Sequence, residues 1–130
     1  MARFLTIGER IHVISPVIRK ALQGRNPEPI IKRAREQIEA GAHYLDVNIG
    51  PADRDGEELM PWAVKILQEE FPDTPLCLDT ANMKAIEAGI KVYDRKPGKP
   101  IINSADAGPR IEMVDLAAEY DAMVIGLCAK

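Results

Sequence analysis

The stretch "TPLCLDTANMKAIEAG" (residues 74–89) places a short apolar run, a polar turn and a helical pattern next to one another. Its apolar run, residues 75–78, ends on Asp79, and neither Lys nor Arg stands beside that carboxylate in the sequence. Asn82 follows at a position typical of a helix N-cap. The stretch therefore predicts a buried β-strand that ends on an acid and leads at once into a helix.

The same order of strand, turn and helix recurs along the whole chain. Strands are predicted over residues 3–11, 42–50, 75–79, 100–104 and 121–129. Helices are predicted over residues 28–41, 57–71, 83–93 and 110–120, with a short helical turn at 15–22. The expected buried stripes of three helices are Ile30, Ile31, Ala34 and Ile38; Leu59, Ala63, Ile66 and Leu67; and Met113, Leu116, Ala117 and Tyr120. Pro61 fits a helix only near its first turn, and Gly89 leaves the end of its helix open.

Regular alternation of strands and helices predicts an α/β fold with a parallel sheet. An open doubly wound sheet and a (β/α)₈ TIM barrel both have this pattern. No G-x-G-x-x-G follows the first strand, which argues against a dinucleotide-binding sheet. A TIM barrel takes roughly 250 residues. We therefore expect residues 1–130 to form the N-terminal part of one such domain, with about five strands and four helices.

The composition excludes several classes of protein. Of the 130 residues, 46% are apolar, and 17 basic against 20 acidic residues give a net charge of -3. This balance argues against nucleic acid or an anionic membrane as a partner held by bulk charge. No stretch is long enough to span a bilayer and no signal peptide is evident, so a cytoplasmic location is expected. Cys77 and Cys128 are both predicted to be buried free thiols, and two histidines exclude a histidine-rich metal site.

Polar residues gather where the predicted strands end, which in parallel α/β folds is where sites lie. Four strands end "GERIH", "LDVNIGP", "CLDT" and "INSAD". Strand alternation puts Asp46 and Asn48 on one face, Asp79 on the same face as Cys77, and Asn103 on the same face as Ile101. Carboxylates and amides with few cations suit a neutral heterocycle rich in N–H donors. They do not suit phosphate.

Each of these residues also has a purely structural interpretation. Asp79 could cap the next helix, and Asn103 could hold its own loop. Asp46 and Asn48 could bond only backbone groups at the rim, and Glu9 could pair with an arginine. The remaining polar or aromatic features are predicted to be a surface loop (His12), helix packing (Trp62) and a solvated basic turn distant from the site (Lys91, Arg95, Lys96 and Lys99).

Taken together, "TIGERI", "GAHYLDVNIGP", "LCLDTANMKAIEAG" and "IINSAD" resemble the methyltetrahydrofolate:corrinoid protein methyltransferases. This pterin-binding family is related to the folate domain of cobalamin-dependent methionine synthase and, more distantly, to dihydropteroate synthase. The resemblance runs over nearly the whole chain. It implies a (β/α)₈ barrel that moves a methyl group between N5 of methyltetrahydrofolate and the cobalt of a separate corrinoid protein.

The resemblance also implies roles for individual residues. Asp79 and Asn103 match the family's pterin-holding acid and amide, and Asn103 is assigned a catalytic role as well. Glu9 matches the acid of the "GER" motif, while Asp46 and Asn48 are expected to line the site. The methyl group would move by SN2 displacement, with N5 as an amine leaving group that needs a proton or a strong hydrogen bond. No metal is expected on this chain, because the cobalt arrives with the corrinoid partner.

The family's site draws a further acid and amide from later strands, which are not among these 130 residues. We therefore expect the isolated chain to have little or no methyl-transfer activity. We also expect its fifth strand to have an unpaired edge that favours a homo-oligomer or a complementing chain. The alternatives are a non-catalytic pterin-binding or half-barrel fragment, and a dihydropteroate synthase-like condensing enzyme. The absence of a Gly-Gly-Glu-Ser run after the second strand argues against the last.

Overall fold

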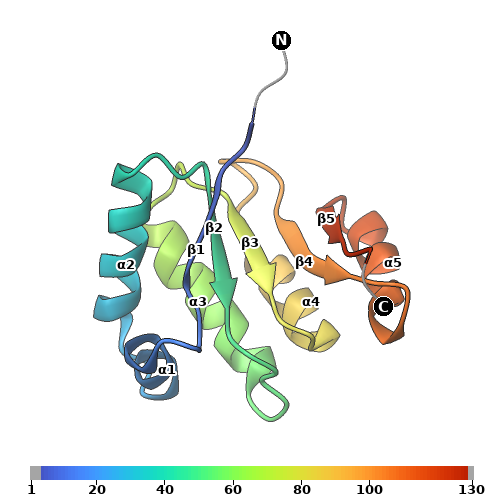
Figure 1. The fold of residues 1–130 in the computed structure, drawn as a ribbon, viewed down its shortest axis with the longest axis horizontal. Helices are drawn as coiled ribbons and strands as arrows, with labels where there is room; N and C mark the ends of the chain where they lie inside the picture. The colour runs from blue at the N-terminus through green and yellow to red at the C-terminus, as the bar shows by residue number, and fades with distance from the viewer. Residues whose placement is uncertain (1–3, 129–130) are drawn as a thin grey trace.

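A five-stranded parallel sheet organises the protein, which we describe over residues 4–128 of a computed structural model. The strands lie side by side in sequence order, β1-β2-β3-β4-β5 (Figure 1). Their bounds are β1 Ile7–Ile11, β2 Tyr44–Asn48, β3 Leu76–Asp79, β4 Ile101–Ala105 and β5 Met123–Gly126. Sequential parallel neighbours joined through helices are the arrangement of a (β/α)₈ barrel, so the structure confirms the predicted barrel-type α/β fold.

Helices connect each strand to the next. Their bounds are α1 Pro16–Gln23, α2 Pro27–Glu39, α3 Gly56–Glu70, α4 Met83–Val92 and α5 Glu112–Glu119, the last preceded by a 3₁₀ turn at Pro109–Ile111. Helices α3 and α4 lie behind the strands in Figure 1, against one face of the sheet. Within residues 4–128, no helix is both long enough and apolar enough to cross a membrane.

Several predicted boundaries needed correction. Residues 16–23 form a full helix rather than a short turn, so the described part has five α-helices and not four. The first strand begins at Ile7; Arg3, where its start was predicted, lies outside the described residues. Helix α4 continues through Gly89 and ends at Val92. A Cβ at Gly89 would come within 2.6 Å of Met60 Cγ on α3. This glycine permits close packing between α3 and α4.

Proline and asparagine mark the starts of the helices. Pro16 and Pro27 occupy the first turns of α1 and α2, where a missing N–H is harmless. Asn82 Oδ1 accepts a hydrogen bond from Ala85 N at 3.2 Å and caps α4, as predicted. Pro61 is an exception, since it lies inside α3 beyond the first turn. The carbonyl that loses its partner there belongs to Glu57, an exposed residue open to water.

The two faces of the sheet pack differently. Leu45, Val47, Leu78 and Ile102 face the helices and belong to the main buried core. Tyr44, Cys77 and Ile101 form a second buried cluster on the other face, which we call the inner face. Alternation along the strands was therefore predicted correctly. The predicted helix stripes are also confirmed, although four members are only partly buried: Ile31, Ile38, Ile66 and Tyr120.

Strand β5 is an edge of the described sheet. Its residues range from half-buried to exposed, and the relative exposure of Met123 is 38%. Cys128, which follows this edge, is exposed, so its predicted burial was wrong. An apolar run at the edge of a sheet has no neighbouring strand to cover it. Cys77, in central strand β3, is buried as predicted.

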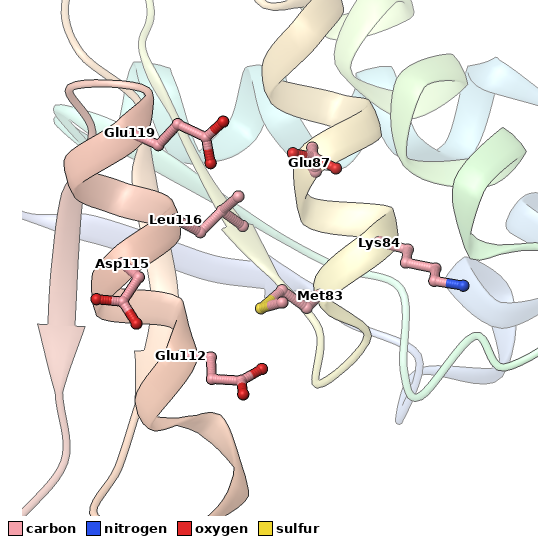
Figure 2. Close-up of a pocket in the computed structure, with 7 residues that line it drawn as sticks. All are labelled: Met83, Lys84, Glu87, Glu112, Asp115, Leu116 and Glu119. Carbon is pink, nitrogen blue, oxygen red and sulfur yellow. The ribbon is translucent and has the colours of Figure 1, made fainter.

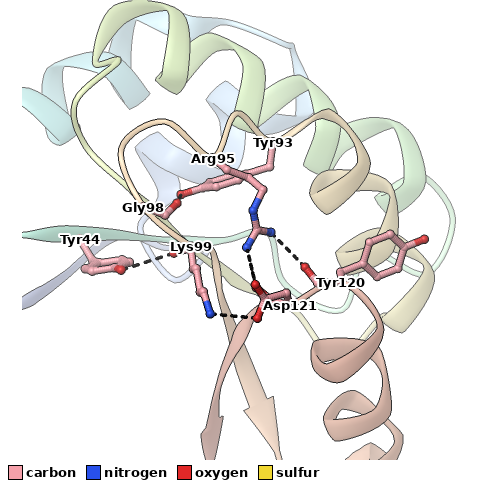
Figure 3. Close-up of polar contacts among 7 residues, drawn as sticks. All are labelled: Tyr44, Tyr93, Arg95, Gly98, Lys99, Tyr120 and Asp121. Carbon is pink, nitrogen blue, oxygen red and sulfur yellow. Dashed lines mark hydrogen bonds and ion pairs between the residues drawn. The ribbon is translucent and has the colours of Figure 1, made fainter.

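The basic residues between α4 and β4 are not merely a solvated turn. Arg95 donates hydrogen bonds to the backbone oxygens of Tyr120, at 3.0 Å, and Asp121, at 2.6 Å. Lys99 Nζ lies 2.9 Å from Asp121 Oδ1, and these contacts tie the α4–β4 loop to the α5–β5 turn (Figure 3). The contacts lie at the amino-terminal ends of β4 and β5. This cluster is therefore distant from the strand ends that carry the candidate site, as predicted.

Candidate functional site

A row of polar side chains crosses the inner face at the carboxyl ends of three strands. Asn48, Asp79 and Asn103 are register partners on β2, β3 and β4. Because strands alternate, all three share a face with Cys77 and Ile101 of the inner cluster. The carboxyl-terminal ends of β2, β3 and β4 therefore bring together the three residues that the sequence analysis placed there.

Asp46 lies one inner-face position below this row, and it contacts Asn103 across the intervening strand. Asn103 Nδ2 donates a hydrogen bond to Asp46 Oδ1 at 3.0 Å, although β3 separates the two strands. The relative exposure of Asp46 is 1%. Neither residue has the alternative role considered for it, since Asn103 does not hold its own loop through this bond and Asp46 does not bond a rim backbone group.

The electrostatic surroundings of Asp46 favour its neutral form. Burial, and then a hydrogen bond and charge repulsion from Asp79, raise the pKa of Asp46 to about 8. Hydrogen bonds from Asn103 and from the Cys77 thiol act in the opposite direction. The pKa of Cys77 is itself raised by burial and by the negative charge of Asp46. A strongly shifted carboxyl among other polar groups is typical of a functional site.

Asp79 is half-buried at the end of β3, and no Lys or Arg forms an ion pair with it within residues 4–128. The helix-cap alternative for Asp79 is wrong, because Asn82 caps α4. Its carboxylate therefore remains available on the inner face as a hydrogen-bond acceptor.

Asn48 and Glu9 differ from the other three candidates. Asn48 Oδ1 accepts a hydrogen bond from Gly50 N at 3.0 Å, so its side chain does hold its own turn. Glu9 is exposed, and it forms no ion pair within the described part of the chain; the neighbouring Arg10 pairs with Glu36 instead. Ile7 packs against the inner-face cluster, and alternation along β1 puts Glu9, two residues further on, on the same side of the strand.

Gly8 of the "GER" motif is required by packing. A Cβ at this position would overlap Gln37 Oε1 on α2. Gln37 is buried, and its Oε1 accepts a hydrogen bond from Arg10 N at 3.0 Å. The glycine therefore lets α2 hold the backbone of β1 next to Glu9.

Thr80 has a supporting role that was not predicted from the sequence. Thr80 Oγ1 donates to Gly50 O at 2.6 Å and accepts from Asn82 N at 3.2 Å. Asn82 Nδ2 in turn donates to Ala52 O at 2.8 Å. These bonds join the β2–α3 and β3–α4 loops on either side of Asp79. The T-x-N spacing after Asp79 was the available signal, since both side chains can bond backbone groups locally.

A separate acidic hollow lies between α4 and α5, outside the inner face (Figure 2). It is lined by Met83, Lys84, Glu87, Glu112, Asp115, Leu116 and Glu119. Glu87 there accepts a hydrogen bond from Tyr120 at 2.9 Å. Within residues 4–128, no group of three or more His, Cys, Asp or Glu side chains is placed to hold a metal ion.

The inner-face residues form a set of acceptors without a cation. Asp79 and Asn103 offer a carboxylate and an amide, while Asp46 bonds Asn103 through Oδ1 and has a second buried oxygen, Oδ2, with no hydrogen-bond partner within residues 4–128. Such a set recognises a planar ring that presents several N–H groups. It provides nothing that would neutralise a phosphate.

Comparison with known proteins agrees with this chemistry. The family described as "Pterin binding enzyme" matches residues 15–129 of the 130-residue chain. The chain belongs to the pterin binding enzyme family. It is also 36% identical, over 100 residues, to the methylcorrinoid:tetrahydrofolate methyltransferase of Eubacterium limosum. That alignment covers 77% of the present chain but only 35% of the relative's length. The resemblance to pterin-binding methyltransferases is therefore confirmed.

Membership in the pterin binding enzyme family gives the polar inner face a context. The family match includes the second, third and fourth strand ends, with Asn48, Asp79 and Asn103. Glu9 lies before its first matched residue, so the assignment of Glu9 rests on the "GER" resemblance alone.

Proposed function

We propose that this chain is the pterin-holding part of a methyltransferase that moves a methyl group between N5 of tetrahydrofolate and the cobalt of a corrinoid protein. The observation that carries the proposal is the bond from Asn103 to Asp46 across β3, beside an Asp79 carboxylate that no cation within residues 4–128 pairs with. The similarity to a methylcorrinoid:tetrahydrofolate methyltransferase supports the choice of reaction.

In this proposal Asp79 accepts hydrogen bonds from N–H groups of the pterin ring. Asn103, held by Asp46, presents its amide to the ring edge and orients N5, which is its assigned catalytic role. Glu9 and Asn48 line the mouth of the site at the ends of β1 and β2. The proposed gain comes from orientation, because a fixed ring places N5 in line with the methyl carbon.

The transfer itself is a displacement at carbon. When the methyl group leaves tetrahydrofolate, Co(I) supplies the electron pair of the new Co–C bond, the C–N5 bond breaks, and N5 keeps its electrons and takes a proton. In the other direction N5 attacks the methyl carbon, loses its proton, and the electron pair of the Co–C bond returns to cobalt. The corrinoid enters as a substrate carried by its partner protein, so these residues need only hold the pterin and assist the proton on N5.

The chain spans 35% of the length of its curated relative, so we propose that binding and turnover separate experimentally. The purified 130-residue chain is expected to bind tetrahydrofolate but not to catalyse methyl transfer with a methylated corrinoid protein. Adding a polypeptide equivalent to the rest of the relative is expected to restore turnover. Robust turnover by the chain alone would contradict the division of the site, and the absence of any pterin binding would contradict the function.

The exposed β5 edge favours association with a second copy or with that complementing polypeptide. Met123 and Leu127 are 38% and 43% exposed there, at the last strand of the described sheet. Light scattering of the chain alone is expected to show a species larger than the monomer. Addition of the complementing polypeptide is expected to replace it with a one-to-one complex, whereas a clean monomer that ignores the added polypeptide would contradict this part.

The dihydropteroate synthase-like alternative has a direct test. A condensing enzyme would join a pterin to p-aminobenzoate, and an assay for that product discriminates the two chemistries. We expect no product from either the chain or its complemented form.

A further inference from the structure

One carboxylate oxygen of Asp46 is buried without a hydrogen-bond donor among the described residues. Its Oδ1 accepts the hydrogen bond from Asn103, but Oδ2 is buried and has no hydrogen-bond partner within the described residues. The relative exposure of Asp46 is 1%, so bulk water does not supply a hydrogen bond to Oδ2. A buried carboxylate oxygen without a donor is strongly unfavourable. A proton on Oδ2 would turn this oxygen from an unsatisfied acceptor into a donor.

The neighbours of Asp46 identify the acceptor for that proton. Strand β3 presents Asp79 and the Cys77 thiol, β4 presents Asn103, and β1 contributes the more distant charge of Glu9. No Lys or Arg within residues 4–128 pairs with Asp46 or Asp79. Two neighbouring carboxyls without a cation do not both ionise readily. Asp79 is the carboxyl group that the strand register brings next to Asp46, since it lies two residues beyond Cys77, the register partner of Asp46, on the same face of β3.

We propose that Asp46 and Asp79 share a single proton, which Asp46 carries on Oδ2 and donates to Asp79. Asp46 is then a positioning residue. Its two oxygens connect Asn103 on one side with Asp79 on the other, and this connection fixes both groups relative to the ligand. The shared proton is a property of the free protein, and only the identity of the ligand rests on the proposed function.

Because Asp46 acts through its two hydrogen bonds, we expect the site to tolerate Asp46→Asn but not Asp46→Ala. In Asp46→Asn, the amide oxygen still accepts from Asn103 and the amide N–H still donates to Asp79, so the variant copies the protonated acid. In Asp46→Ala both bonds are lost. The two substitutions therefore separate the role of the hydrogen bonds from the role of a negative charge at position 46.

The direct test is infrared spectroscopy of the ligand-free chain. At neutral pH the wild type is expected to show the C=O stretching band of a protonated, buried carboxyl, which shifts in D₂O and disappears as the pH passes about 8. Asp46→Asn is expected to abolish the band. Asp106→Asn is the matched control and should leave it unchanged, because Arg110 lowers the pKa of Asp106 and keeps it ionised. Absence of the band in the wild type would overturn the proposal without any variant.

Ligand binding then tests the positioning role. For tetrahydrofolate, we expect wild-type affinity to fall as the pH rises through the loss of the band, Asp46→Asn to bind within a few-fold at all pH values, and Asp46→Ala to bind at least roughly tenfold more weakly. Weak binding by Asp46→Asn at neutral pH would overturn the positioning role. A wild type that shows the band but binds no pterin would refute the proposed function and the positioning role, while the shared proton would stand.

Discussion

Asn103 Nδ2 lies 3.0 Å from Asp46 Oδ1, although 57 residues separate them in the chain and β3 runs between their strands. The strand that lies between them carries Cys77, the buried register partner of Asp46. The contact therefore requires β2, β3 and β4 to be in place together. This bond makes the inner face a defined site and not a collection of polar strand ends.

Replacement of Asn103 by Ala is expected to destabilise the protein by about 1–3 kcal/mol, because Asp46 Oδ1 loses its donor in a buried place. Urea unfolding followed by circular dichroism measures this loss. Asn103→Asp is a second variant, which places a third carboxyl beside Asp46 and Asp79. Its loss of unfolding free energy should grow as the pH rises, because the additional carboxylate becomes charged. Unchanged stability in Asn103→Ala would contradict the importance of the bond.

Replacement of Asn82 by Ala is expected to lower the free energy of unfolding by about 1–2 kcal/mol. The variant loses the cap on α4 and the bond that joins Nδ2 to Ala52 O. Asn82→Asp keeps the cap acceptor and loses only the Nδ2 donor, so its loss should be intermediate. Asn26→Ala, which removes a longer cap bond of 3.4 Å to Glu28 N, is the control and should change stability less. The reverse order in denaturant titrations would argue against a role for Asn82 in joining the loops.

Replacement of Gly8 by Ala is expected to destabilise the protein by about 1–3 kcal/mol, since the new methyl group displaces Gln37 and its bond to Arg10 N. Gly126→Ala is the matched strand control, because a Cβ there meets nothing within 4 Å. In the Gln37→Ala background, Gly8→Ala should cost less than it does in the wild type. Equal effects of Gly8→Ala in both backgrounds would locate the strain elsewhere.

Stability should fall as the pH rises through the range in which Asp46 titrates. The pKa of Asp46 is raised from 3.8 to about 8 by burial and by Asp79, so the folded state binds a proton that the unfolded state releases. The stabilisation is complete below the unfolded pKa and is lost as the pH passes the folded value. Asp46→Asn should flatten this dependence between about pH 4 and about pH 8 in urea titrations. Parallel curves for the variant and the wild type would exclude Asp46 as the titrating group.

Most of the fold could be predicted from the sequence because its signals are local. Alternation in "YLDVN" and "PLCLD", the prolines that start α1 and α2, and the Asn82 cap are each readable within a few residues. Burial at the sheet edge was not readable in this way. The apolar run around Cys128 has the pattern of a buried strand, and only the order of the strands shows that nothing in the described sheet covers it.

The candidate site was predicted as a set of residues but not as a network. The alternation of side chains along each strand predicted that Asp46, Asp79 and Asn103 point toward the site, and the strand register of the structure puts all three on one face of the sheet. The sequence could not show that Asn103 reaches over β3 to Asp46, because that contact joins side chains on two strands that are not neighbours in the sheet. The same limit hid Thr80, whose bond to Gly50 O joins two loops that are distant in sequence.

The most direct test of the central claim is an NMR titration of the ¹⁵N-labelled 130-residue chain with tetrahydrofolate, which detects binding even at millimolar affinity. We expect amide shift changes concentrated at the carboxyl ends of β2, β3 and β4, at Gly50, Thr80 and Asn103. We expect these changes to be lost in Asp79→Ala with the fold retained. Shift changes that are absent, or that cluster instead around the acidic hollow between α4 and α5, would contradict it.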